Sequence, residues 1–231
     1  MRTPQLLSNK YAIIVAGGSG TRMGTDIPKQ FLLLNGIPIL MQTINTFYDY
    51  DPQITIIVVL PEEQKNYWQK LCTEHRFNRQ HTVVTGGMTR FHSVKNALKY
   101  VPENAFVAIH DGVRPLVSRE IITRTFEAAE KAKAACPVIP LTDSIRKKVR
   151  GMTKQVNRRN YFLVQTPQVF SSSYIIEAYK QDFVNTFTDD ISVFESYRQR
   201  RPVLVEGSPE NIKITTPVDL IIAEAILKCR T

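Results

Sequence analysis

The sequence has few cysteines and no long run of apolar residues. Its three cysteines, Cys72, Cys136 and Cys229, lie far apart, with no CxxC pair and no histidine at metal-ligand spacing, which argues against a disulfide framework and a zinc module. No apolar stretch reaches the roughly 18 residues that span a bilayer, and residues 1–10 lack the apolar centre of a signal peptide. We therefore expect a cytoplasmic protein with no membrane partner.

Acidic residues are also in the minority. The 231 residues include 30 Lys and Arg against 21 Asp and Glu, which gives a formal net charge of +9. Such an excess indicates that the protein meets something anionic. A hydrophobic share of 43% over this length is enough for a core without disulfides. Because no linker or repeat interrupts the chain, we expect a single domain over residues 1–231.

Two kinds of segment alternate along the chain. Short β-branched runs predict strands, and longer segments with apolar residues at helical spacing predict helices. The predicted strands cover residues 11–16, 54–60, 82–85, 106–110, 137–141 and 203–206. The predicted helices cover residues 62–74, 90–100, 119–134 and 189–198, and others start at Pro38, Ser171 and Pro217. This alternation predicts an α/β fold, a mostly parallel sheet with helices on both faces.

Residues 142–164 break the alternation. The segment is polar and holds seven basic residues: Arg146, Lys147, Lys148, Arg150, Lys154, Arg158 and Arg159. Its halves, 144–149 and 154–164, are predicted to pair as a projecting β-hairpin about Gly151. An isolated hairpin is poorly stable, so we expect this arm to pack on a second subunit.

The first predicted strand ends in a glycine-rich loop at residues 17–24. The loop matches neither the P-loop, nor the dinucleotide fingerprint, nor the nucleophile elbow. Its glycines would let backbone N–H groups approach an anion, and Arg22 and Lys29 follow as cations. A plain glycine turn with solvated cations is the alternative.

A second glycine turn, Gly86-Gly87, stands between a predicted strand and a predicted helix. Both turns would open on the carboxyl edge of a parallel sheet, where ligands bind. Here Gly86 and Gly87 would admit a flat base and Ser93 would hydrogen-bond to it, although an ordinary tight turn is as consistent with the spacing.

Asp111 follows another predicted strand and is a candidate ligand for Mg²⁺. The alternative is a structural salt bridge between Asp111 and Arg114. His110 has no partner motif and is interpreted as structural. Lys213, just before the last predicted helix, would add a cation if the chain returns to the same sheet edge.

Eight blocks of the chain together resemble the 2-C-methyl-D-erythritol 4-phosphate cytidylyltransferase family of the non-mevalonate isoprenoid pathway. They are residues 16–23, 28–31, 86–93, 110–115, 143–144, 165–168, 188–190 and 211–215. The resemblance implies transfer of a cytidylyl group from CTP to a sugar-alcohol phosphate, with Mg²⁺ or another divalent cation as cofactor. It also implies a Rossmann-like fold of the nucleotide-diphospho-sugar transferase type, and a homodimer whose arms, at about residues 142–164, reach into the partner's active site.

The same resemblance implies roles for individual residues. Catalytic roles fall to Arg22, Lys29, Arg158 and Lys213. The nucleotide-binding residues would be Ala16, Gly17, Gly18, Gly20, Gly86, Gly87 and Ser93. The acceptor-binding residues would be Asp111, Arg114, Ser144 and Thr166, with Asp111 also at the metal.

Two other functions stay open at this point. A ribitol 5-phosphate cytidylyltransferase would share the first loop and the Lys-Gln-Phe block, although residues 188–190 and 207–211 look more like the methylerythritol enzyme. A non-catalytic basic protein that binds nucleic acid would explain the charge but neither glycine turn. We therefore expect small-molecule substrates and no nucleic-acid partner.

Overall fold

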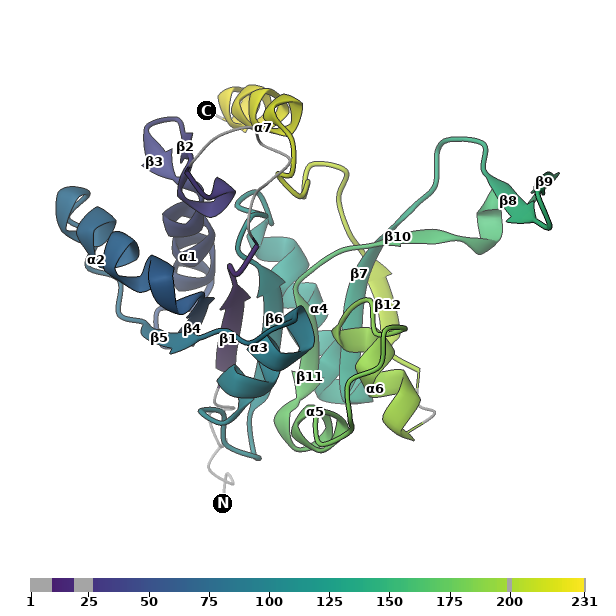
Figure 1. Cartoon of the computed structure of the whole chain (residues 1–231), viewed down its shortest axis with the longest axis horizontal. Helices are drawn as coiled ribbons and strands as arrows, with labels where there is room; N and C mark the ends of the chain where they lie inside the picture. Colours follow the sequence, from purple (N-terminus) through teal and green to yellow (C-terminus); the bar gives the residue numbers. More distant parts are fainter. Residues whose placement is uncertain (1–9, 19–26, 199–200, 231) are drawn as a thin grey trace, which may run out of the picture.

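The computed structural model describes residues 10–18, 27–198 and 201–230, and its centre is one eight-stranded sheet (Figure 1). The strand order is β10-β7-β11-β6-β1-β4-β5, and β12 also pairs with β7. The strands are β1 (Lys10–Val15), β4 (Thr55–Leu60), β5 (Thr82–Thr85), β6 (Phe106–Asp111), β7 (Ala134–Pro140), β10 (Phe162–Val164), β11 (Gln168–Ser171) and β12 (Val203–Glu206). β10 and β11 pair antiparallel and the other strand pairs are parallel. The predicted α/β fold is confirmed.

Helices cover both faces of the sheet, because alternate residues of a strand point to opposite sides. One face carries α1 (Ile39–Tyr50), α2 (Lys65–Glu74) and α4 (Arg119–Ala132). The other carries α3 (Arg90–Leu98), α5 (Ser172–Ala178) and α6 (Asp190–Arg198). In β1, Ala12 and Ile14 belong to the first core and Ile13 to the second.

A third, smaller core lies at one end of the sheet. It joins α7 (Pro217–Arg230) to the short strand β2 (Leu33–Leu34), which pairs with β3 (Ile37–Pro38). Val113, which follows β6, and Ile214, which precedes α7, are buried in it. Figure 1 shows α7 lying across the end of the molecule toward which β1 points. The third core therefore holds the chain before α7 at the carboxyl edge of the sheet.

Two element boundaries near residue 134 differ from the sequence-based expectation. The helix predicted to reach residue 134 ends at Ala132, because Lys133 takes a left-handed conformation with φ of 75°. Strand β7 begins directly afterwards, before the predicted start at residue 137. Strand β11 was not predicted at all.

The predicted arm is present, but its second half was assigned incorrectly. Strands β8 (Arg146–Val149) and β9 (Met152–Gln155) pair across Arg150 and Gly151, whose φ angles of 46° and 81° suit a two-residue hairpin turn. Residues 162–164, expected in this hairpin, form β10 and pair with β7 instead. Figure 1 shows the hairpin projecting far from the sheet, at the end of two extended segments.

Within residues 10–18, 27–198 and 201–230, no helix combines the length and the apolar composition that a membrane crossing needs.

Candidate active site

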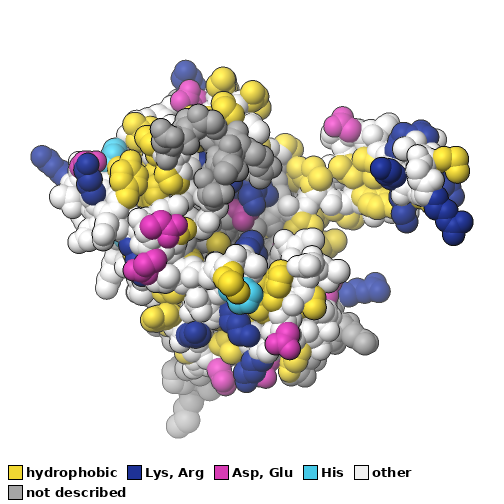
Figure 2. Space-filling model, viewed as in Figure 1, with side chains coloured by type: hydrophobic (Ala, Val, Ile, Leu, Met, Phe, Trp, Pro, Cys, Tyr) yellow, Lys and Arg dark blue, Asp and Glu magenta, His cyan; other side chains and the backbone are white. Residues whose placement is uncertain are grey.

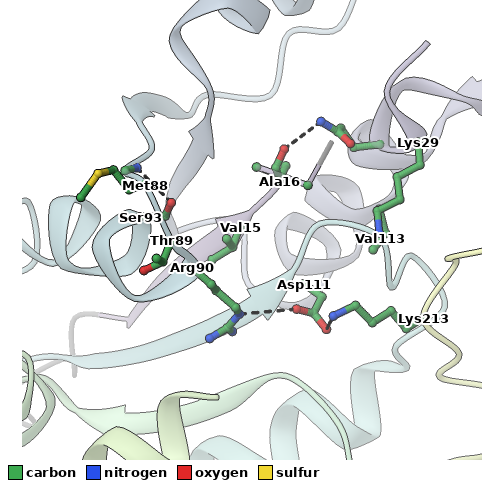
Figure 3. A pocket seen from close by; sticks show the side chains of 14 residues that line it. Val15, Ala16, Lys29, Met88, Thr89, Arg90, Ser93, Asp111, Val113 and Lys213 are labelled. Carbon is green, nitrogen blue, oxygen red and sulfur yellow. Dashed lines mark hydrogen bonds and ion pairs between the residues drawn. The ribbon is translucent and has the colours of Figure 1, made fainter. Parts of the chain in front are cut away.

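A cavity of about 270 Å³ opens at the carboxyl ends of β1 and β6, beside the start of α3 (Figure 3). Five segments build its wall: the turn after β1, the segment with Lys29 and Gln30, the turn before α3, the end of β6 and the segment before α7. Eight of the predicted site residues line it: Ala16, Gly17, Gly18, Lys29, Gly87, Ser93, Asp111 and Lys213. The two glycine turns therefore do converge on one site, as the sequence predicts.

The turn after β1 lies close to its neighbours. A Cβ added to Gly18 would lie 3.3 Å from Lys29 Cε, so the glycine leaves room for the lysine stem to pass over the backbone. The next residue, Gln30, is fully buried, and its Nε2 donates to the Ala16 carbonyl at 2.8 Å. Lys29 thus begins from a fixed backbone and extends along the cavity (Figure 3).

The second turn is held by the residue that was predicted to bind a base. Ser93 Oγ accepts a hydrogen bond from the Gly87 N–H at 3.0 Å, and Thr89 caps the start of α3. Gly86 lies behind the cavity wall, where its N–H donates to the Leu60 carbonyl at 2.8 Å. Met88 lines the cavity with 92% of its surface exposed, so an apolar side chain stands at the rim.

Asp111 lies among three cations. Its Oδ2 is 3.1 Å from Arg114 Nε and 3.1 Å from Lys213 Nζ. Its Oδ1 is 3.9 Å from Arg90 Nε, and Figure 3 shows Arg90 and Lys213 on either side of the carboxylate. Burial raises the pKa of the Asp111 carboxyl, but attraction to Arg90, Lys213 and Arg114 outweighs burial and holds this pKa well below its usual range. The salt bridge to Arg114, left open as an alternative, is therefore present, and Asp111 is ionised at neutral pH.

A buried network supports Asp111 from behind. The Asp111 N–H donates to Thr166 Oγ1 at 3.1 Å, and this hydroxyl lies 3.0 Å from His110 Nδ1. His110 Nε2 lies 3.0 Å from the Arg114 carbonyl. Burial lowers the pKa of His110 to about 4, so the ring is neutral. His110 is structural, as interpreted from the sequence, and Thr166 lies behind the cavity rather than in its wall.

The chain before α7 does return to the sheet edge. The Ile214 N–H donates to the Val113 carbonyl at 2.9 Å, and Arg114 Nη1 donates to the Asn211 carbonyl at 2.7 Å. These bonds fix the backbone on both sides of Lys213. From the sequence, a role for Lys213 in the site depended on this return of the chain, which no local pattern predicts.

Besides Gly86, Arg114 and Thr166, two further described residues of the predicted site do not line this cavity. Ser144 and Arg158 lie on the arm and line a separate groove there, where Arg158 Nη1 donates to the Thr142 carbonyl. Gly20 and Arg22 lie outside the described residues. Among the described residues, a single chain thus brings together only part of the predicted site.

Arg90 and Asp190 had no predicted role. Arg90 lines the cavity and donates to the buried carboxylate of Asp190 at 2.6 Å. Both lie in blocks that carry the family resemblance, which was the available signal, but 100 residues separate them in the chain.

Of the residues that the structure describes, Asp111 alone offers a carboxylate to a metal ion in this cavity. Among the described residues, no three His, Cys, Asp or Glu side chains gather as a metal site. Asp111 Oδ2 is occupied by Arg114 and Lys213, whereas Oδ1 is 3.9 Å from Arg90 Nε. A single carboxylate oxygen suits Mg²⁺, which keeps several waters and takes phosphate oxygens as further ligands. The residues therefore fit a Mg²⁺ that is held mainly by a bound triphosphate.

Fold and cavity together define a nucleotide-binding α/β protein, because two glycine turns and several cations meet at the carboxyl edge of a parallel sheet. Comparison with known proteins narrows this class. The chain belongs to the IspD family, 2-C-methyl-D-erythritol 4-phosphate cytidylyltransferase, whose family model matches residues 11–229.

The relatives agree over nearly the full length. The chain is 54% identical over 221 residues to the 2-C-methyl-D-erythritol 4-phosphate cytidylyltransferase of Azobacteroides pseudotrichonymphae, covering 96% of this chain and 100% of the relative. Identity to the Bacillus mycoides protein of the same name is 39%, over 93% of this chain and 96% of the relative. The crystal structure of 4-diphosphocytidyl-2C-methyl-D-erythritol synthase from Anaerococcus prevotii is similar with a TM-score of 0.81, at 30% identity and 96% coverage of both chains.

Proposed function

We propose that this chain, acting as one domain over residues 1–231, transfers the cytidylyl group of CTP to 2-C-methyl-D-erythritol 4-phosphate in isoprenoid precursor synthesis. An oxygen of the acceptor phosphate bonds to the α-phosphorus of CTP, and the bond from that phosphorus to pyrophosphate breaks. The observation that carries the proposal is the cavity itself, in which two glycine turns, Lys29, Lys213 and Asp111 meet in a chain of this family.

The chemistry needs no general base from the protein. A phosphomonoester with a second pKa near 6 is mostly dianionic at pH 7 and attacks directly. The main obstacle is the approach of two anions, which fixed cations relieve by alignment and charge stabilisation. Lys29 and Arg22 would stabilise the charge around the α-phosphate, while Lys213 would hold the acceptor phosphate beside Asp111 and Arg114.

The nucleotide would bind against the two turns. Ser93 Oγ accepts from the Gly87 N–H, so its own hydrogen is available for an acceptor atom of cytosine. Gly17 and Gly18 leave backbone accessible at the other side of the cavity. Mg²⁺ bound with the triphosphate would supply further charge neutralisation, with Asp111 as its protein ligand.

We also propose that the active unit is a homodimer in which each arm completes the partner's site. Four consecutive apolar residues at the base of the arm, from Tyr161 to Val164, are between 43% and 50% exposed. Figure 2 shows this hydrophobic surface along the base and a cluster of Lys and Arg at the tip. A second subunit would cover the apolar run and receive Ser144 and Arg158 for its bound acceptor.

The first test is release of pyrophosphate from CTP in the presence of Mg²⁺, with each acceptor supplied separately. Release with 2-C-methyl-D-erythritol 4-phosphate, and not with ribitol 5-phosphate, is expected. ATP, GTP and UTP serve as controls for the base. Release with ribitol 5-phosphate alone would move the chain to the sister activity. Failure with both acceptors, together with salt-sensitive binding to random oligonucleotides, would favour the nucleic-acid alternative.

A further inference from the structure

Three helices meet around a buried carboxylate beneath the cavity. Asp190, the first residue of α6, has 0% of its surface exposed. Its Oδ2 accepts a hydrogen bond from Arg90 Nη2 at 2.6 Å, and its Oδ1 accepts one from the Tyr179 hydroxyl at 2.5 Å. Both oxygens are therefore occupied, one from the start of α3 and one from the end of α5.

Arg90 connects this buried carboxylate to the cavity. Its side chain is 30% exposed, lines the cavity and reaches to 3.9 Å from Asp111 Oδ1 (Figure 3). Lys213 and Arg114 hold the other oxygen of Asp111. Asp111 is thus held from two sides, and the Arg90 side is itself fixed by Asp190.

Helix stability does not explain this arrangement. Arg90 is the first residue of α3, where the helix dipole disfavours a cation. A buried ion pair adds little net stability, because desolvation offsets most of the attraction between its members. The helix dipole makes this position unfavourable for Arg90, and the fully buried Asp190 offsets that cost. We take this to indicate that the guanidinium is needed at the cavity, beside Asp111.

Tyr179, which donates to Asp190 from the side opposite Arg90, is itself closely packed. The Tyr179 ring stacks on Phe91, with ring centroids 4.7 Å apart and an interplanar angle of 23°. Phe91 follows Arg90 in α3, so the same helix that carries the guanidinium also packs on the residue that donates to Asp190. Tyr179 and Phe91 therefore fix the orientation of the Asp190 carboxylate relative to Arg90.

We infer that Asp190 is a positioning residue of the cytidylyl-transfer site, which restrains Arg90 so that Asp111 keeps its alignment with Lys213. The inference rests on the proposed function. Without the Asp190 charge, Arg90 is free to close the 3.9 Å gap to Asp111 and to compete with Lys213 for the carboxylate. Asp111 and Lys213 would then no longer be aligned to bind the phosphate of the acceptor.

The test is Asp190→Asn in the full-length protein, with Asp189→Asn as the matched control. Misplacement of the site lowers kcat by between about tenfold and a hundredfold, while the affinity for CTP stays within about twofold. Asp189 caps α6 through the Ser192 N–H at 2.9 Å and has no ion pair with Arg90 among the described contacts. Its variant should keep wild-type turnover, whatever it does to the melting temperature.

A double-mutant cycle separates positioning from folding. In an Arg90→Met background, Asp190→Asn should cost less than about twofold further in kcat, because the residue through which it acts is gone. The double variant also removes both charges of the buried pair, so it folds without an unpaired ion. Wild-type kcat in Asp190→Asn, or an equal loss in both backgrounds, would overturn the inference.

A readout without substrates distinguishes this inference from the proposed function. Hydrogen exchange at Arg90 Nη2, the nitrogen that donates to Asp190, is followed by ¹⁵N NMR and should be accelerated at least tenfold by Asp190→Asn and unchanged by Asp189→Asn. Unchanged exchange in Asp190→Asn would reject the anchoring itself. A wild-type protein that shows slow exchange but no pyrophosphate release would instead reject the proposed function.

Discussion

Asp111 carries one negative charge and lies within 4 Å of three cations: Arg90, Arg114 and Lys213. With the carboxylate ionised, these four side chains sum to a charge of +2, before Lys29 is counted. A cavity with this balance attracts a triphosphate and a phosphomonoester more strongly than a neutral sugar. At the residue scale, then, the positive charge favours phosphorylated substrates, and the glycine turns determine the shape of the cavity that receives them.

His110, behind Asp111, makes stability depend on pH. Its pKa is about 4 in the folded chain against an ordinary value of 6.5, because burial disfavours the charged ring. Between these values the unfolded chain binds a proton that the folded chain does not, so stability falls as pH falls. The linkage predicts that this residue lowers the free energy of unfolding by about 2 kcal/mol at pH 5 relative to pH 8.

Urea unfolding of wild type and His110→Gln at both pH values measures this term. Burial lowers the pKa of His81 as well, so the difference between the two proteins isolates His110. The Asp111 carboxyl titrates only below this window, since its pKa is held low. Equal pH dependence in the two proteins would contradict the prediction.

At the element scale, the ends of β1 and β6 approach each other unusually closely at the cavity. A Cβ added to Gly112 would lie 2.9 Å from Ala16 Cβ and 3.2 Å from the Val15 carbonyl oxygen. The Gly112 N–H donates to that same carbonyl at 2.9 Å. We expect Gly112→Ala to force the two strand ends apart and to lower the free energy of unfolding by about 1–3 kcal/mol.

Gly17→Ala is the matched control for stability, because no described residue lies within 4 Å of an added Cβ there. Its free energy of unfolding should stay within about 0.5 kcal/mol of wild type. Urea titrations of both variants measure the two free energies of unfolding. If the two lose the same stability, close packing between β1 and β6 is not the cause.

Elements with strong local patterns could be predicted from the sequence, and elements defined by distant pairing could not. Strand β4 is a continuous β-branched run buried on both faces, and β5 was placed with its observed bounds. By contrast, β11 has four residues and runs antiparallel between β6 and β7. The apolar residues of β10 looked like part of the hairpin because only the register with β7 assigns them to the sheet.

The candidate site divides in the same way. Glycines and cations that follow strands could be located from local sequence, because parallel strands end at a common edge. The pairing of Arg90 with Asp190 could not, because it joins the starts of α3 and α6, which pack on the same face of the sheet. Contacts of that kind depend on how helices pack, which no local pattern specifies.

At the scale of the whole molecule, the arm and the cavity belong to different parts of one chain. The arm projects from the sheet (Figure 1), and its groove holds Ser144 and Arg158 while the cavity holds Lys29 and Lys213. The hairpin strands β8 and β9 are exposed at every residue. Such a hairpin is marginal by itself, as expected if it packs on a second subunit in the proposed homodimer.

Hybrid dimers test whether sites are shared between subunits. Lys29→Ala should lower kcat by about a hundredfold, the cost of losing one donor to the transition state, and Arg158→Ala should weaken use of the acceptor. In a dimer that exchanges arms, one site of each hybrid pairs an intact cavity with an intact arm. An equal mixture of the two variants should therefore recover roughly a quarter of wild-type turnover, since half of the dimers are hybrids with one intact site of two.

Native mass spectrometry of the mixture verifies the exchange of subunits, and each variant mixed with itself is the control. If every site is confined to one chain, a hybrid contains two damaged sites and turnover stays at the level of the separate variants. Recovery thus requires that Arg158 of one protomer act beside Lys29 of its partner. Absence of recovery despite demonstrated hybrids would reject the shared site and leave the arm as an element of assembly alone.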